Sequence, residues 1–299
     1  KHPDDLFKGH INQLVVRAIN SGIDLFDALR MASLNPVKHY SLPIGLMREG
    51  DFADFIRVRD LKEFELLQTY VEGEVVAEDG VSKLLEFKSA VVNNFEAKNV
   101  SVEDLKVLTE DSENKMNVIH VNEGQLVTDW IKRFPTLLGK EAVSDTIQDV
   151  LKLVVYNRYS KNEVSLAFIH GFGLKLGAIA SSVAHDSHNI IAVGVDDDSI
   201  ADAINLIVRE KGGISAVGNE KMGVLGLPIA GLMSNKDPEE VALDYEQIDS
   251  FAKNILGSTL KAPYMSLSFM ALLVIPSLKL SDKGLFDGGK FEFVNLFAS

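Results

Sequence analysis

Residues 171–195, GFGLKLGAIASSVAHDSHNIIAVGV, contain the pattern that decides the fold of the larger part of the chain. The stretch begins with closely spaced glycines, passes through a polar cluster at 185–189, and ends in an apolar run at 190–195 that predicts a strand. Beyond it, apolar residues recur at helical spacing from position 198 or 199 until Gly212, which predicts an amphipathic helix. A strand that leads into such a helix is typical of an α+β domain.

The flanking regions show the same mixture of elements. A second helix is predicted from Asp237-Pro238 to Gly257, because apolar residues again form one face and proline suits a first helical turn. Residues 145–160 are compatible with helix or strand. The other predicted strands are short and lie at 117–121, 125–128, 214–218 and 223–227. Residues 84–299 are therefore expected to form a separate α+β domain.

The first 41 residues are expected to be helical. One helix is predicted from Pro3 to Gly22, with acidic residues at the positive end of its dipole. A shorter helix is predicted from the N-cap Asp24 through Met31, ending before Asn35-Pro36.

Residues 42–83 have a different texture, with glycines that separate short β-rich runs. The runs 55–58, 70–71 and 75–76 are predicted strands, and Glu72-Gly73-Glu74 is a predicted tight turn between two of them. This segment is expected to be a piece of antiparallel sheet without catalytic residues.

The composition excludes several classes of partner. The chain has 43 acidic and 30 basic residues, a formal net charge of −13, so it would repel phosphate backbones and no nucleic acid partner is expected. It has no cysteine, which excludes disulfides and thiolate metal sites and suits a reducing, cytoplasmic compartment. The richest apolar run, 265–275, is too short to cross a bilayer, so no membrane partner and no signal peptide are expected.

The polar cluster in the central stretch is the densest group of chemically active side chains. His185, Asp186 and His188 supply two imidazoles and a carboxylate within four residues, which are able to ligate a metal or move protons. In the alternative interpretation the histidines are partly buried and hydrogen-bonded, and Asp186 caps a turn. The spacing lacks the helical context of the zinc-binding H-E-x-x-H motif, so it does not decide between the two.

Other motifs favour structural roles. The glycines at 171, 173 and 177 miss the dinucleotide-binding pattern, and close backbone packing explains them better. Asp196, Asp197 and Asp198 are expected to cap the helix that follows rather than hold a cation. No G-x-S-x-G serine motif is present, and a chain without cysteine cannot be a zinc deaminase of the H-x-E, P-C-x-x-C type.

Several longer stretches resemble the C-terminal part of the adenine deaminase family, within the amidohydrolase superfamily. ALRMASLNP at 28–36, followed by residues 46–50 and Ala53-Asp54-Phe55, resembles the amidohydrolase C-terminal signature. KHPDDL at 1–6 with Gly9-His10 resembles the segment after the last barrel strand of these deaminases. The more specific matches are GFG at 171–173 through residue 191, LPIAGLM at 227–233, and SLSFMAL at 266–272 followed by Ile275-Pro276.

The resemblance implies a fold and an activity. Residues 1–41 would be the last helical segment of a (β/α)8 barrel, residues 42–83 part of a small β-sandwich, and residues 84–299 the adenine deaminase C-terminal domain. The activity would be hydrolysis of adenine to hypoxanthine and ammonia, in purine salvage or catabolism. It would require a binuclear divalent metal centre, manganese or iron, and the enzyme would be a homo-oligomer such as a dimer.

The chain departs from the family pattern in one respect. The family's metal ligands belong to barrel strands that precede Lys1, so no residue of this chain is assigned to metal, and the chain alone is expected to be inactive. The upstream barrel portion of the same enzyme is thus an expected partner.

The candidate site lies where the extra domain would meet the barrel mouth. His185, Asp186 and His188 are the candidate catalytic residues, and Ser187, Asn189 and His10 are candidates for binding adenine. His2 should also fall near the C-terminal ends of the barrel strands. The alternative function is a non-catalytic capping or dimerisation module of another amidohydrolase.

Overall fold

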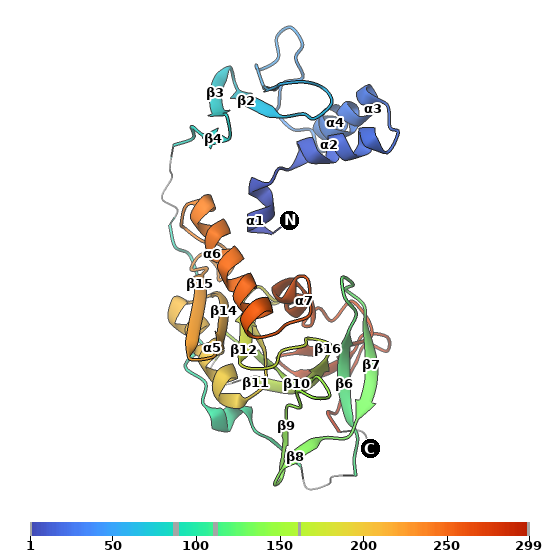
Figure 1. Ribbon diagram of the computed structural model, residues 1–299, viewed down its shortest axis with the longest axis vertical. Coiled ribbons are helices and arrows are strands. Elements are labelled where there is room, and N and C mark those ends of the chain that lie inside the picture. Colours follow the sequence, from blue (N-terminus) through green and yellow to red (C-terminus); the bar gives the residue numbers. More distant parts are fainter. Residues whose placement is uncertain (1, 86–89, 110–112, 161–162, 298–299) are drawn as a thin grey trace. The chain divides into compact units, whose positions relative to one another are not determined.

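The computed structural model describes residues 2–85, 90–109, 113–160 and 163–297, and the chain divides into two compact units, Lys1–Lys88 and Ser89–Ser299 (Figure 1). The first unit begins with short helices and continues into a small sheet. Its helical elements are α1 Pro3–Phe7, α2 Ile11–Asn20, α3 Leu25–Leu29, the π-helical turn η1 Arg30–Leu34, and α4 Asn35–Tyr40.

The helix ends of the first unit confirm one prediction and correct two. Asp24 caps α3, because its side chain accepts hydrogen bonds from the backbone N–H groups of Phe26 and Asp27. The single helix predicted over residues 3–22 is wrong: the chain breaks at Gly9, whose φ of +125° lies outside helical geometry. The predicted end before Asn35-Pro36 is also wrong, since α4 begins there with proline in its first turn, where no N–H donor is needed.

The sheet of the first unit is a four-stranded antiparallel meander in chain order, β1 Phe55–Val58, β2 Leu66–Val71, β3 Glu74–Glu78 and β4 Val81–Ser82. The predicted turn between β2 and β3 is confirmed, with Glu72 and Gly73 both at positive φ. Asp54 fastens the entry to this sheet, because its carboxylate accepts the N–H groups of Gly45 and Glu72, each at 2.7 Å. Those backbone hydrogen bonds hold the pKa of Asp54 below its ordinary value.

The second unit is built on an eight-stranded sheet in the order β15-β14-β12-β13-β10-β11-β6-β7. Neighbouring strands are antiparallel except β6 and β11, which run parallel. The strands are β6 Met116–Val121, β7 Thr128–Arg133, β10 Val150–Tyr156, β11 Val164–His170, β12 Ala178–Ser181, β13 Ile190–Gly194, β14 Gly213–Gly218 and β15 Lys221–Gly226.

Both faces of this sheet are covered, so its central strands are buried throughout. One face packs against α6 Pro238–Ser250, its π-helical extension η3 Phe251–Ile255, and α7 Pro263–Phe269. The same core includes the meander β16 Leu278–Ser281, β17 Gly284–Asp287 and β18 Glu292–Val294.

The opposite face packs against α5 Asp197–Glu210 and the 3-10 turn η2 Val102–Leu105. Beside them, the small sheet β5 Val107–Leu108, β9 Glu141–Val143 and β8 Thr136–Leu138 covers a third cluster that includes Val118, Val150 and Phe168. Successive residues of a strand point to opposite faces, so Ala180 belongs to the α5 side and Ile179 to the α6 side.

The last described residues return to the sheet. The backbone of Asn117 donates to Leu296 O at 2.8 Å, its side chain donates to Asn295 O at 2.8 Å, and Met116 pairs with Phe297. This short connection joins the end of the chain to the start of β6.

The predicted α+β class is confirmed, with local differences. Asp196 and Asp237 cap α5 and α6. The ambiguous stretch 145–160 contains the strand β10. The strand predicted at 125–128 is wrong, because Gln125 lies in the turn after β6, where its N–H bonds to Asn122 O, and β7 begins only at Thr128.

Candidate functional site

The polar cluster lies in an eight-residue connection between β12 and β13, residues 182–189, which we call the histidine loop. Because β12 and β13 are antiparallel, the loop projects from one end of the eight-stranded sheet. Its N-terminal half is held by Ser182, whose hydroxyl is buried and donates to Gly231 O at 2.6 Å. The N–H of His185 donates to Ser268 O at 3.0 Å, which ties the loop to α7.

The five predicted site residues of the histidine loop have different surroundings. Asp186 and Ser187 are exposed, and the carboxylate of Asp186 makes no hydrogen bond or ion pair to any described residue, so it caps no turn. Asn189 is buried; its Oδ1 accepts from Arg158 N at 3.2 Å and its Nδ2 donates to Ser187 Oγ at 3.3 Å. Both ends of the Asn189 amide are thus engaged within the protein.

The two imidazoles of the loop lie together. The ring of His185 stacks on Phe269 with centroids 5.1 Å apart, and meets the ring of His188 edge-on at 5.3 Å. His188 adopts a left-handed backbone conformation with φ of 54°. Burial lowers the pKa of His188, and the charges of His185 and Arg158 add to that effect, so its neutral form is favoured near neutral pH.

The Nδ1 atom of His188 is buried and has no hydrogen-bond partner among the described residues. The same holds for Ser268 Oγ, in the segment that the loop contacts, and for Ser160 Oγ, next to the tyrosine that binds the loop. Buried polar atoms are rarely left unpaired, so His188 Nδ1 calls for a partner from outside the described residues.

Arg158, which the sequence did not single out, is the main support of the loop. It follows β10, is 3% exposed, and its Nε donates to His188 O at 2.6 Å. The neighbouring Tyr159 donates its hydroxyl to Ser187 O at 2.8 Å. Backbone carbonyls carry no signature in a sequence, so this support could not have been found from residue patterns.

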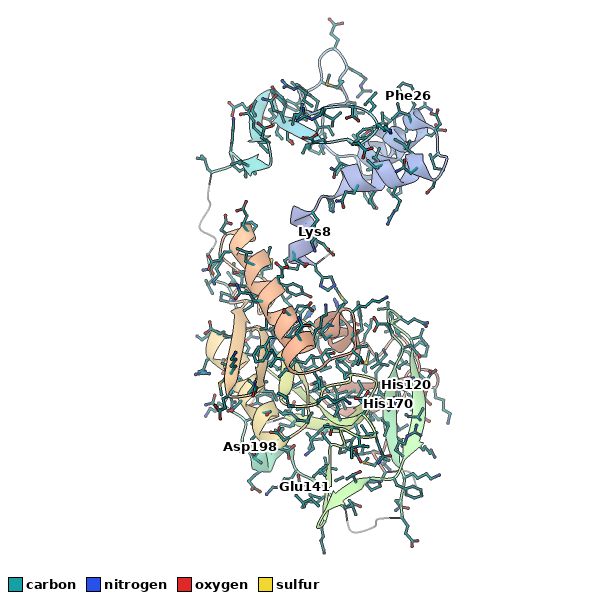
Figure 2. The ribbon with its side chains drawn as sticks, viewed as in Figure 1. Lys8, Phe26, His120, Glu141, His170 and Asp198 are labelled. Carbon is teal, nitrogen blue, oxygen red and sulfur yellow. The ribbon has the colours of Figure 1, made fainter. Side chains whose placement is uncertain are left out.

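A second pair of histidines lies at the opposite end of the same sheet (Figure 2). His120 on β6 and His170 on β11 are in register, and their Nδ1 atoms are 2.8 Å apart, one donating to the other. We call them the histidine pair. Burial lowers the pKa of His170, and the charge of His120 acts in the same direction. The pair was missed because its members are 50 positions apart and only the strand register joins them.

Two buried lysines were also missed. Lys152 is 1% exposed, and its Nζ lies 2.6 Å from Asp197 Oδ1 and 3.5 Å from Glu141. Asp197 therefore binds a buried cation as well as starting α5, although burial raises its pKa. Lys279 is fully buried, and among the described residues it donates to the carbonyls of Leu126 and Phe269, at 2.7 and 3.1 Å; burial lowers its pKa to about 8.

The predicted site residue His10 lies in the first unit, whereas the histidine loop lies in the second. His10 is exposed and precedes α2, and its N–H donates to Asn12 Oδ1 at 3.0 Å. His2, the other histidine expected near the barrel mouth, precedes α1.

Metal, groove and membrane features bear on what the described residues can do. No three His, Asp or Glu side chains among them are grouped to hold a metal ion, so the implied binuclear centre does not fit this part of the protein.

A groove of about 630 Å³ lies between β15 and α6, lined by residues such as Met222 and Phe251, and none of its lining comes from the histidine loop. No described helix combines the length and apolar character that crossing a membrane requires.

Residues 125–292, more than half of the chain, match the family model of the adenine deaminase C-terminal domain. The chain belongs to this family. The resemblance found in the sequence is thereby confirmed, and residues 4–76 match the model of the amidohydrolase family. The histidine loop, Arg158 and His170 lie within the range matched by the adenine deaminase C-terminal domain, whereas His120 precedes it.

Curated relatives give the same assignment. The chain is 50% identical to an adenine deaminase of Salinibacter ruber over 299 residues, which covers 99% of this chain and 54% of that protein. It is 50% identical to the enzyme of a Sulfurovum species over 295 residues and 45% identical to that of Borreliella afzelii over 296, each again covering 54% of the relative and at least 98% of this chain. The chain thus spans about half the length of the curated relatives it matches.

Proposed function

We propose that this chain is part of an adenine deaminase that converts adenine and water to hypoxanthine and ammonia, and that the histidine loop contributes to its substrate site. The family membership and the relatives named adenine deaminase support the reaction. The observation that carries the role of the loop is the buried Nδ1 of His188, which has no partner among the described residues and belongs to an imidazole whose neutral form is favoured.

The chemistry of deamination suits such a group. Water adds at C6 of the purine, and the amino nitrogen must gain a proton before it leaves as ammonia. A neutral imidazole offers one hydrogen-bond donor and one acceptor, so His188 would bind a polar edge of the ring or pass a proton, with His185 beside it. The exposed residues Asp186 and Ser187 complete the proposed set within the loop. Asn189, whose amide is engaged within the protein, would hold the loop in place, and His10 is proposed separately as a residue of the first unit.

The proposal for the full-length protein includes a binuclear divalent metal centre, manganese or iron, outside the described residues. It also includes the upstream barrel portion, a homo-oligomer and a cytoplasmic location. The segments 1–41, 42–83 and 84–299 would be the barrel tail, the sandwich segment and the C-terminal domain.

The test is the conversion of adenine to hypoxanthine, followed by absorbance, in the full-length protein with added Mn²⁺. Replacing His188 with Gln should lower kcat/KM about tenfold or more, equivalent to about 1.4 kcal/mol of transition-state stabilisation. The control is His170→Gln, at the other end of the sheet, which should keep kcat/KM within about twofold. An unchanged rate in His188→Gln together with a lower melting temperature would mean that the loop is only structural.

The isolated 299-residue chain provides a second test. Because the described residues contain no group of three metal ligands, it should not turn over adenine even with Mn²⁺. Turnover near that of a full-length relative would contradict the proposal that the metal ligands lie outside the described residues.

The alternative, a dimerisation module, is favoured by one surface. Phe291 and Phe293 are 66% and 53% exposed, and both pack edge-on against Phe286. Sedimentation of the protein with and without adenine separates the two functions: a stable dimer that neither binds nor deaminates adenine would favour the module.

A further inference from the structure

Arg158 is a buried cation with no counter-ion among the described residues. Its side chain is enclosed, and none of its partners in this part of the chain is a carboxylate. Its partners are instead two backbone carbonyls, an amide oxygen and a phenol, and the rings of Phe95 and Tyr159 lie beside it. Burying a charge this way is costly, so its hydrogen bonds must be well placed.

The guanidinium joins segments that are far apart in the chain. Nε donates to His188 O at 2.6 Å, one terminal nitrogen to Ala230 O at 2.7 Å, and the other to Asn93 Oδ1 at 3.2 Å. Because the guanidinium is planar and its donors are fixed relative to one another, these contacts determine where each segment lies. Lysine has the same charge but no such fork.

Three consecutive residues of the histidine loop are bound by Arg158 and Tyr159. Tyr159 Oη donates to Ser187 O, Arg158 Nε donates to His188 O, and Arg158 N donates to the side chain of Asn189. With the carbonyls on both sides of the His188 α-carbon held, its left-handed conformation cannot relax. The direction in which the His188 imidazole leaves the backbone is thereby set.

The turn at 230–231 is shaped around the same guanidinium. A Cβ atom on Gly231 would lie 2.4 Å from a terminal nitrogen of Arg158, and Gly231 has a φ of +71°. Gly231 O also accepts the buried hydroxyl of Ser182 at the start of the histidine loop. The segment 227–233, which the sequence showed only as a motif, therefore packs on Arg158 through its 230–231 turn and keeps the guanidinium beside the histidine loop.

We propose that Arg158 is a positioning residue for His188: its fork of hydrogen bonds holds the His188 imidazole in the orientation that deamination requires, with Tyr159 and the 230–231 turn as its supports. This inference rests on the function proposed above. It assigns no contact with substrate to Arg158.

The experiment compares Arg158→Lys, Tyr159→Phe, His188→Gln and the Arg158→Lys/His188→Gln double variant in the full-length protein. Arg158→Lys keeps the charge and loses the fork, so kcat/KM should fall about tenfold, mainly in kcat. Tyr159→Phe removes one bond to the loop and should cost less. The double variant should be no slower than His188→Gln alone, because both changes act through one imidazole.

Two further measurements separate positioning from loss of fold. The NMR signals of the His188 imidazole should change position in Arg158→Lys. In Arg158→Gln the pH profile of kcat/KM should shift to higher pH, because the change removes a cation that lowers the pKa of His188. Lys152→Met is the control, since it unpairs a buried ion cluster elsewhere in the unit; it should lower the melting temperature while kcat/KM stays within about twofold below the transition.

The outcomes are distinct. The positioning role is overturned if Arg158→Lys keeps the wild-type kcat/KM, or if the losses of the two single variants multiply in the double variant. In either case a slow His188→Gln leaves the proposed function standing. Full activity in His188→Gln overturns the role proposed for the loop. If the wild type does not deaminate adenine, the proposed function fails, and unmoved NMR signals of His188 in Arg158→Lys would still overturn the positioning role.

Discussion

The two ends of the eight-stranded sheet each carry two histidines, but in opposite states. In the histidine pair, the Nδ1 atoms of His120 and His170 satisfy each other at 2.8 Å. In the histidine loop, His185 and His188 touch only through their rings, and His188 Nδ1 is buried without a described partner. Adjacent imidazoles do not by themselves mark a site; what separates the two ends is an unfilled hydrogen bond and a backbone held in place around it.

The largest expected effect tests how rigidly each end is built. Replacing Gly231 with Ala places a methyl group against the buried guanidinium of Arg158 at positive φ, and should lower the free energy of unfolding by about 3–5 kcal/mol. Gly171→Ala beside the histidine pair is also strained, because Gly171 has a φ of +102° and the added Cβ would lie 3.1 Å from Val121 O, but this approach is less severe than the 2.4 Å at Gly231 and should cost about 1–3 kcal/mol. Urea unfolding measures both, and equal losses would remove the contrast.

Lys279 contacts residues near both ends of the eight-stranded sheet. It donates to the carbonyl of Leu126, in the turn after β6, and to that of Phe269, whose ring stacks on His185. Its pKa is lowered to about 8 in the folded protein, so between pH 8 and its ordinary value the unfolded chain binds more protons and stability rises with pH. The full rise is about 3 kcal/mol over some two and a half pH units. Unfolding of the wild type and Lys279→Met at pH 7.5 and 9.5 checks this, and parallel pH curves for the two proteins would contradict it.

A double-mutant cycle should separate the two histidine clusters. Changing His120 and His170 to Ala singly and together should give a coupling energy of about 1 kcal/mol, because one hydrogen bond joins them. The same cycle on His185 and His188 should give a coupling below about 0.5 kcal/mol, because no hydrogen bond joins them. A larger coupling in the loop than in the pair would reverse the comparison.

The smallest effect concerns mildly acidic pH. The pKa values of His170 and His188 are both lowered in the folded state, so the unfolded chain binds more protons below about pH 6.5 and stability is lost as the pH falls from that value. Melting temperatures between pH 7 and pH 5 should fall less steeply in His170→Gln and in His188→Gln than in the wild type. His39→Gln, at an exposed position of the other unit, is the control and should leave the slope unchanged.

Local elements were predictable because their causes are local. Asp24, Asp196 and Asp237 cap helices through their own neighbours, and the turn at Glu72 and Gly73 follows from positive φ at both positions. One prediction failed because the backbone depends on a single angle, at Gly9; the others failed at element boundaries, where α4 begins at Asn35 and where β7 begins only at Thr128.

The site was only half predictable for a related reason. The polar residues of the histidine loop are adjacent in the sequence and were found, but Arg158 acts on carbonyl groups, which every residue has. The histidine pair depends on the register between two parallel strands separated by 50 positions. Neither arrangement leaves a pattern of residue types to detect.

The tie between residues 295–297 and the start of β6 has a consequence for how the protein is made. Asn117 and the residue that binds its side-chain amide are separated by 178 positions, and Trp130 Nε1 donates to the same amide at 2.9 Å. A chain that emerges from the ribosome in order cannot complete these contacts until residues 295–297 are free of the exit tunnel. Until then the backbone groups at the start of β6 that bond to residues 296 and 297 are open to other strands, which favours wrong pairing during synthesis.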